Sequence, residues 1–311
     1  MSKKIKSPVP LTPAMSASEA AAAIFKHHFK YMERWEKTAR GFDDIEGVHQ
    51  LRVSFRKIRS AFSLFRDAIP KAVSQPWNQE IRWIASQLGL ARDLDVFIAE
   101  GMGAIEGKLP FNGEKKLLEL ARAARAEAYA SEVRPMLDSD RFANLKKGFE
   151  EWYEQRSWEQ ESDDNKALKR QQMRIIQYSR KLLDKQERRV LTLGSHIDRR
   201  DAQQMHRLRI ECKKLRYAAD FFRPLYSGFG GFMEHMAGLQ DILGVMNDIA
   251  VTHHLLELLL ANNSDHETLE YAGAIVGWRT CDYYHQLQNF DRYWDEFTEA
   301  THPWWKKGAH D

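Results

Sequence analysis

Residues 48–65 read VHQLRVSFRKIRSAFSLF and residues 205–222 read MHRLRIECKKLRYAADFF, so one motif occurs twice with an offset of 157 residues. The copies share a histidine, a leucine, an arginine, a basic pair, a second arginine and a final phenylalanine at matching positions. A second pair of segments, QLGLARDLDV at 87–96 and ILGVMNDIAV at 242–251, follows at an offset of 155 residues. Two motifs repeated in the same order predict an internal duplication of one helical unit.

Each copy of the first motif separates into a basic and an apolar stripe when it is placed on a helix at about 100° per residue. The basic stripes are His49, Arg52, Arg56 and Arg59 in the first copy, and His206, Arg209, Lys213 and Arg216 in the second. Both keep the spacing i, i+3, i+7, i+10, so each stripe is about 15 Å long. The apolar stripes, which begin at Leu51 and Leu208, are expected to face the core.

Acidic residues do not balance the charge of these two windows. Residues 48–66 contain five basic side chains and no acidic one, and residues 205–217 contain five basic side chains and one acidic one. On a solvated helix, oppositely charged neighbours at i±3 or i±4 stabilise by about 0.2–0.5 kcal/mol, and like charges cost a similar amount. We therefore expect an external polyanion, because rows of guanidinium groups suit phosphate oxygens. A solvated face with incidental charge is the alternative.

The rest of the sequence predicts an all-α fold. Glycine and proline are sparse, at 17 and 9 of 311 residues, and apolar residues recur at helical spacing over most of the chain. We expect two helical halves of about four helices each, separated by a polar stretch. The predicted boundaries are a flexible N-terminal segment at 1–15, a first half at 16–155, a linker at 156–166, a second half at 167–301 and a C-terminal tail at 302–311.

Several classes of protein are excluded or disfavoured by composition. A net charge of +3 argues against a uniformly basic nucleic-acid binder. No apolar run approaches the roughly 18–20 residues of a membrane span, and no signal peptide is apparent, so we expect a cytoplasmic protein with no membrane partner. Cys212 and Cys281 have no disulfide or zinc-type spacing, and adjacent histidines such as His27 and His28 diverge on a helix. We expect neither a metal nor a cofactor.

The repeated motif, V-H-x-L-R-x-x-x-R-K-x-R and then M-H-R-L-R-x-x-x-K-K-x-R-Y, resembles the CHAD family, named for a conserved histidine α-helical domain. The two LG segments are similar to the second signature of that family, so the resemblance rests on four segments and covers nearly the whole chain. It implies two pseudo-symmetric four-helix bundles that form one domain with a basic central channel for inorganic polyphosphate. The E-x-E-x-K motif of a fused triphosphatase is absent, so the chain resembles the stand-alone form.

The resemblance implies that both copies of the motif contact polyphosphate. The implied binding residues are His49, Arg52, Arg56, Lys57, Arg59, His206, Arg209, Lys213, Lys214 and Arg216, with Arg66 and Arg92 as secondary candidates. For the two histidines, the alternative is an orienting or capping role. Asp93 and Asp248 are expected to orient nearby arginines. Asn247 stands where the first half has Arg92, and Cys212 stands where it has Phe55, so the two-fold symmetry is expected to be imperfect.

The expected function is non-enzymatic binding of inorganic polyphosphate, with polyphosphate granules and their proteins as partners that the resemblance suggests. A general polyanion-binding protein that takes RNA or DNA is the alternative, because electrostatics alone permit it, although no base-stacking platform is evident. A phosphohydrolase would need clustered carboxylates to hold a metal, and the basic stripes contain almost none.

Overall fold

The computed structural model describes residues 8–162, 164–262 and 265–305 of the chain. These residues form helices, with no β-strand among them and one isolated antiparallel bridge between Ser16 and Arg174. The all-α prediction is therefore confirmed. Residues 1–7, which belong to the segment predicted to be flexible, and 306–311 of the predicted tail lie outside the described residues.

The first arm of the molecule comes from the chain before the predicted linker. Its helices are α1 (Ala17–Gly41), α2 (Glu46–Leu64), α3 (Lys71–Gln87), α4 (Gly89–Val96), α5 (Glu114–Ala128), α6 (Arg134–Asp138) and α7 (Asp140–Glu154), with π-helical turns at Phe97–Met102 and Tyr129–Val133. α1 begins at Ala17 with Ser16 as its N-cap, because Ser16 and Glu19 form a reciprocal capping box.

The second arm follows the predicted linker. Its helices are α8 (Asn165–Gln171), α9 (Ile175–Gly194), α10 (Ala202–Phe222), α11 (Phe229–Leu260), α12 (His266–Leu287) and α13 (Phe290–Glu299), with short 3-10 turns at Arg223–Leu225 and Pro303–Trp305. A further 3-10 turn, Ser157–Glu159, lies within the predicted linker and packs against α7 of the first arm. The arms differ in build, because α3 and α4 are separate helices whereas α11 is continuous over 32 residues. Pseudo-symmetry of two four-helix bundles therefore stays a prediction.

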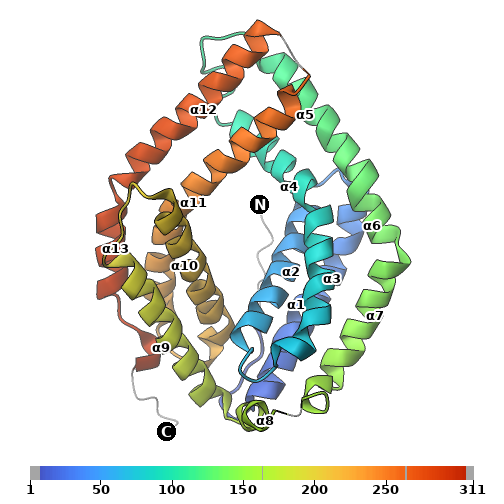
Figure 1. The fold of residues 1–311 in the computed structure, drawn as a ribbon, viewed down its shortest axis with the longest axis vertical. Helices are drawn as coiled ribbons and strands as arrows, with labels where there is room; N and C mark the ends of the chain where they lie inside the picture. The colour runs from blue at the N-terminus through green and yellow to red at the C-terminus, as the bar shows by residue number, and fades with distance from the viewer. Residues whose placement is uncertain (1–7, 163, 263–264, 306–311) are drawn as a thin grey trace.

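The two arms lie side by side and meet at both ends (Figure 1). At one end Gly113, in the left-handed region at φ +89°, approaches the backbone of Glu267 so closely that a Cβ there would clash. At the other end the hydroxyl of Tyr178 on α9 donates a 3.0 Å hydrogen bond to the carbonyl oxygen of Leu64 at the end of α2. These junctions hold α2 and α10 on the facing inner sides of the arms.

The apolar stripes predicted for the two motif helices do face the core. Their members are each at most 3% exposed, and they are Leu51, Phe55, Ile58, Phe62 and Phe65 in the first copy and Leu208, Cys212, Leu215, Ala219 and Phe222 in the second. Phe62 packs against Phe25 of α1, with 4.8 Å between ring centroids. Burial of one face of each motif helix fixes which side chains remain for the opposite face.

Parts of the N-terminal segment, the predicted linker and the C-terminal tail are packed against this core. Trp158, inside the predicted linker, is fully buried and donates a 2.8 Å hydrogen bond to the hydroxyl of Ser18. Val9 and Leu11 of the N-terminal segment are buried, and so is Trp304 of the C-terminal segment. A few large apolar side chains thus anchor stretches whose overall composition is polar.

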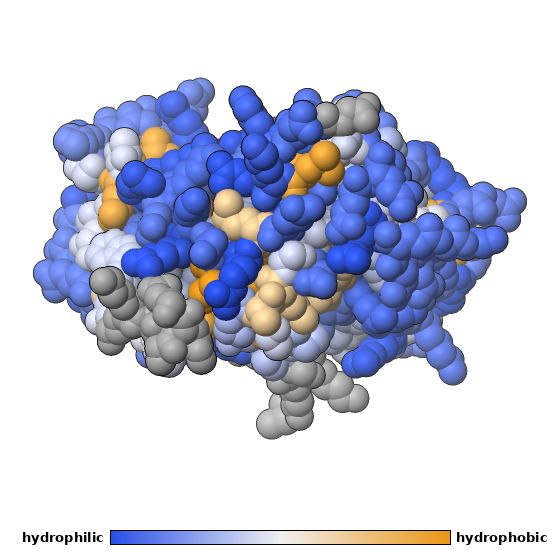
Figure 2. Space-filling model, turned by 90° about the horizontal axis from the view of Figure 1, so that it is seen from below, coloured by the Kyte–Doolittle hydropathy of each residue, from blue (hydrophilic) through white to orange (hydrophobic). Residues whose placement is uncertain are grey.

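α11 is the one helix among the described residues whose length and composition would allow it to cross a membrane. It packs against α10, α12 and α13, and a core helix passes the same test, so this is weak evidence of a membrane segment. The lower end of the molecule, where α8 lies, is covered mainly by hydrophilic residues with small apolar patches between them (Figure 2).

Candidate anion-binding site

The inner faces of α2, α3 and α10 enclose a groove of about 810 Å³, which we call the central groove. Seven basic residues line it, and no acidic residue does. They are Arg56 and Arg59 of α2, Arg66 just after α2, Lys71 and Arg82 of α3, and Lys213 and Lys214 of α10. The fold thus brings residues from both copies of the motif, 157 positions apart in sequence, to one surface.

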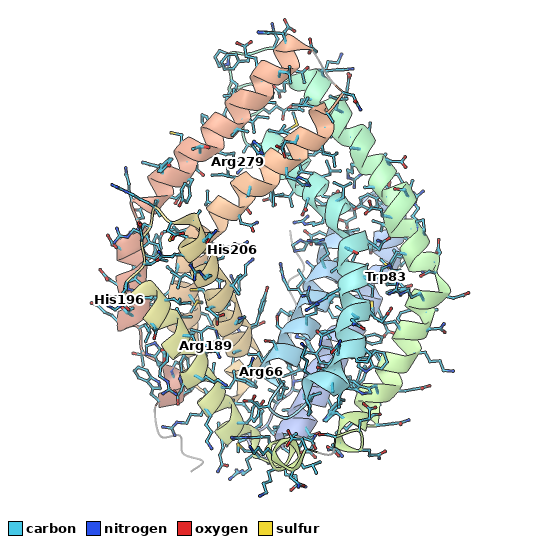
Figure 3. All side chains as sticks on the ribbon, in the orientation of Figure 1. Arg66, Trp83, Arg189, His196, His206 and Arg279 are labelled. Carbon is cyan, nitrogen blue, oxygen red and sulfur yellow. The ribbon has the colours of Figure 1, made fainter. Side chains whose placement is uncertain are left out.

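A second hollow of about 390 Å³, the upper pocket, shares Arg56 and Lys213 with the central groove. Its other lining residues include the basic Arg52, Arg92, Arg209 and Arg279, the histidine His49, and the acidic Asp93, Glu100 and Asp248. Arg279 lies on α12 towards the upper end of the space between the arms, and Arg66 lies towards its lower end (Figure 3). The two hollows therefore form one continuous basic tract along α2.

Most cations of the central groove have no acidic partner. Among the residues that the structure describes, no ion pair is formed by five of the seven, which are Arg56, Arg59, Lys71, Arg82 and Lys213. Arg66 has its Nε 3.8 Å from Oδ1 of Asp67, and Lys214 has its Nζ 2.5 Å from Oε1 of Glu211. The groove consequently carries a local excess of positive charge that the protein itself does not neutralise.

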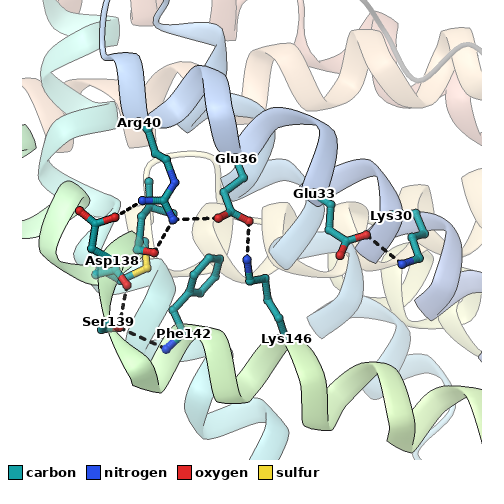
Figure 4. Close-up of polar contacts among 10 residues, drawn as sticks. Lys30, Glu33, Glu36, Arg40, Asp138, Ser139, Phe142 and Lys146 are labelled. Carbon is teal, nitrogen blue, oxygen red and sulfur yellow. Dashed lines mark hydrogen bonds and ion pairs between the residues drawn. The ribbon is translucent and has the colours of Figure 1, made fainter.

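Cations on the outer side of the first arm are paired, in contrast to those of the groove. Glu36 of α1 accepts hydrogen bonds from Arg40 at 2.9 Å and from Lys146 of α7 at 2.7 Å (Figure 4). Arg40 also pairs with Asp138. The same chain thus pairs these outer cations with carboxylates but pairs only two of the seven cations of the groove, so the imbalance is a property of the groove and not of the overall composition.

The groove also places its cations where a positive charge is disfavoured. Burial, followed by the nearby Arg209 and Arg56, lowers the pKa of Lys213 from 10.5 to about 8. Burial also lowers the pKa of Arg59, with Arg82 adding to the effect. A bound anion would oppose this lowering of the pKa, because it supplies the opposite charge that favours the protonated form. The surroundings of Lys213 and Arg59 therefore disfavour their protonated forms.

In the upper pocket, carboxylates lie beside the motif arginines. Arg52 donates a 3.2 Å hydrogen bond to the carbonyl oxygen of Ala85. Burial lowers the pKa of Arg52, and the nearby carboxylate of Asp93 opposes this lowering. In the second copy, burial lowers the pKa of Arg209, and Asp248 likewise opposes this lowering. The Nε of Arg209 is buried, with no hydrogen-bond partner among the described residues. Unsatisfied buried donors are costly, so this atom marks a position where a ligand oxygen would be favourable.

Four of the predicted binding residues have surroundings that the sequence did not reveal. Lys57 reaches Asp220 of α10, with 2.5 Å between Nζ and Oδ2, and so links the two arms instead of lining a hollow. Arg216 donates a 2.8 Å hydrogen bond to Gln240. His206 is exposed and lines neither hollow. His49 does line the upper pocket, where burial and then Arg92 lower its pKa.

Three basic residues of the tract were missed by sequence reasoning: Lys71, Arg82 and Arg279. A signal existed for α3, where Lys71, Gln75, Asn78, Gln79 and Arg82 recur at helical spacing and form the face that lines the groove. Arg279 had no comparable signal, because it is a single cation on α12 whose position depends on how α12 packs over the upper pocket.

The model of the CHAD domain family matches residues 23–257 of this chain. The crystal structure of the CHAD domain from the plant Ricinus communis is similar over 96% of this chain and 99% of that one, with a TM-score of 0.80 and 24% identity. PptA from Streptomyces chartreusis is similar over 90% and 99%, with a TM-score of 0.66 and 13% identity. At these identities the likeness concerns the fold.

Two curated relatives of the chain are longer than the chain itself. Uncharacterised proteins from two strains of Mycobacterium tuberculosis are 23% identical over 243 residues, which is 76% of this chain and 45% of each relative. The chain therefore spans less than half the length of the curated relatives that it matches.

Proposed function

The chain belongs to the CHAD family, and on that premise we propose that it binds inorganic polyphosphate along the central groove and the upper pocket. One observation carries the proposal: seven basic residues from both arms line the central groove without a single acidic residue among them. A linear polyanion would neutralise successive cations and release the counterions of the polymer. Guanidinium groups bind phosphate oxygens in a bidentate manner, which suits the arginines of α2.

We propose a binding role rather than a catalytic one. Phosphoryl transfer depends on charge stabilisation by metal ions held by carboxylates, and on a positioned base. The central groove offers cations without carboxylates, and the acids Asp93 and Asp248 of the upper pocket lie beside arginines. That arrangement suits the retention of a phosphate chain better than its cleavage.

The test is calorimetric titration with long-chain polyphosphate, single-stranded DNA of matched phosphate count, and orthophosphate. The variant Arg56→Glu with Lys213→Glu removes the two cations common to both hollows. We expect its affinity for polyphosphate to fall by at least about 100-fold, because each charge-assisted contact contributes about 1.5 kcal/mol. The control Arg200→Glu with Arg207→Glu changes the net charge equally, at exposed positions that line neither hollow.

Three outcomes distinguish the possible functions. Tight binding of polyphosphate that only the groove variant loses supports the proposal. Equal binding of DNA and polyphosphate favours the general polyanion-binding alternative, which the unpaired cations also permit. Binding of neither polymer would contradict both and would assign the groove to a protein partner.

We further propose a cytoplasmic location in association with polyphosphate granules, on the basis of the family alone. A fluorescent fusion that concentrates on granules, and that becomes diffuse when Arg56 and Lys213 are both changed to Glu, is the expected result. A diffuse signal for the unsubstituted protein in cells that contain granules would contradict it.

A further inference from the structure

A third basic hollow, which we call the lateral hollow, lies where the end of α2 meets α8 and α9. It has a volume of about 230 Å³. Six basic residues line it, which are Arg66, Arg170, Lys181, Lys185, Arg189 and Lys214. The one acidic residue in its lining is Asp67, whose carboxylate oxygens lie 3.8 Å from both Arg66 and Lys185. The lateral hollow therefore repeats the charge imbalance of the central groove on a different pair of helices.

The acidic residues of α9 are engaged away from this hollow. Asp184 accepts hydrogen bonds from the indole nitrogens of Trp304 at 2.9 Å and Trp305 at 3.1 Å. Glu187 is buried, with Oε1 2.6 Å from Nε2 of His302. These are the two acidic residues of the helix, and the C-terminal segment uses both. No acidic residue of α9 therefore faces the row of Lys181, Lys185 and Arg189 at i, i+4 and i+8, and Asp67 from outside the helix is the acidic residue that lines the hollow beside it.

The lateral hollow continues directly from the central groove. Both are lined by Ser63, Leu64, Arg66 and Lys214, so these residues form a common rim. Arg66 lies between the arms, and Arg189 lies beside it on α9 (Figure 3). An anionic chain that follows α2 to its end therefore meets further cations across a rim that includes Arg66 and Lys214.

We propose that a long polyphosphate chain leaves the central groove past Arg66 and Lys214 and continues along α9 in the lateral hollow. The proposal rests on the proposed function and adds a second binding segment to it. The tract along α2 from His49 to Arg66 is about 26 Å long, and the row from Lys181 to Arg189 adds about 12 Å. Short chains fit within the first part, so only long chains gain from the second. The hollow thereby makes the protein selective for chain length.

The test compares two double variants with the same loss of charge. Lys185→Gln with Arg189→Gln removes two cations of the lateral hollow. Lys169→Gln with Arg188→Gln is the matched control, because both residues are exposed on α8 and α9 and line none of the three hollows. Affinities for tripolyphosphate and for long-chain polyphosphate are measured across a range of salt concentrations.

For the hollow variant, we expect long-chain affinity to fall about tenfold and the slope of log affinity against log salt to fall by about 2. Its affinity for tripolyphosphate is expected to stay within about twofold of the unsubstituted protein, and the control is expected to match that protein with both ligands. Equal long-chain binding by hollow variant and control would overturn the proposal, and so would an equal loss for both chain lengths. If the unsubstituted protein binds neither ligand, the proposed function itself fails.

Discussion

Replacing Lys213 by methionine is expected to stabilise the free protein while it weakens polyphosphate binding. The side chain is half-buried between Arg209 and Arg56, and its pKa is lowered from 10.5 to about 8. That fall corresponds to about 3 kcal/mol, which partial solvent screening reduces to about 1 kcal/mol. Methionine keeps the length of the side chain and removes the charge. The free energy of unfolding should therefore rise by about 1 kcal/mol at pH 7.

The pH dependence of this gain follows from the direction of the pKa change. Between pH 8 and about 10.5 the unfolded chain binds a proton at Lys213 that the folded protein has lost, so the stability of the unsubstituted protein rises with pH in this window. The advantage of Lys213→Met is complete below pH 8 and vanishes above about pH 10.5. Urea denaturation at pH 7 and pH 10.5 measures both values.

Lys147→Met is the control for this experiment, since Lys147 is exposed on α7 and forms no ion pair among the described residues. Its effect on the free energy of unfolding is expected to stay within about 0.5 kcal/mol at both pH values. Saturating long-chain polyphosphate should raise the melting temperature of Lys213→Met less than that of the unsubstituted protein. A loss of stability in Lys213→Met at pH 7 would refute the claim that the groove strains this cation.

Three other outcomes follow from the same structure. Polyphosphate affinity should be higher at pH 6 than at pH 8 and should fall further by pH 9, because a polyanion raises the lowered pKa values of His49 and Lys213. Calorimetry in buffers of different ionisation enthalpy would measure the uptake of protons on binding. Lys57→Met should lower the free energy of unfolding by about 1–2 kcal/mol in urea denaturation, because it leaves Asp220 unpaired between the arms, and should leave the salt dependence of polyphosphate binding unchanged. Trp158→Ala should cost about 3–5 kcal/mol by the same assay, whereas a freely exposed linker would lose almost nothing.

The sequence predicted correctly which face of a helix is buried where that face depends on the pattern of the helix itself. Helical spacing alone placed Arg52, Arg56 and Arg59 on the face opposite Phe55 and Ile58, and burial of the latter two bears out that division. It also predicted that the second copy would bury Cys212 and Leu215 on its own core side, although the residues differ between copies.

Helical periodicity could not predict which side chains of different helices would contact one another. Lys57 follows Arg56 directly and so lies about 100° around α2, where Asp220 of α10 meets it. Nothing in the local sequence encodes that partner, 163 residues away. The contribution of α3 through Lys71 and Arg82 likewise depends on the angle at which α3 packs beside α2. A pattern on one helix predicts its own faces, and tertiary packing decides which other helix completes a site.

The distribution of carboxylates divides the basic tract into two parts with different physical roles. In the upper pocket, Asp93 and Asp248 lie near Arg52 and Arg209 in matching positions of the two copies, so each of these guanidinium groups has a carboxylate of the protein in its surroundings. The central groove has no such acids, and Lys213 there is destabilised as a cation. A side chain that is already oriented loses less conformational entropy when a ligand binds. Affinity and its salt dependence come instead from positive charge of the protein that only the ligand neutralises. We therefore expect the upper pocket to orient a bound phosphate chain and the central groove to supply most of the free energy that retains it.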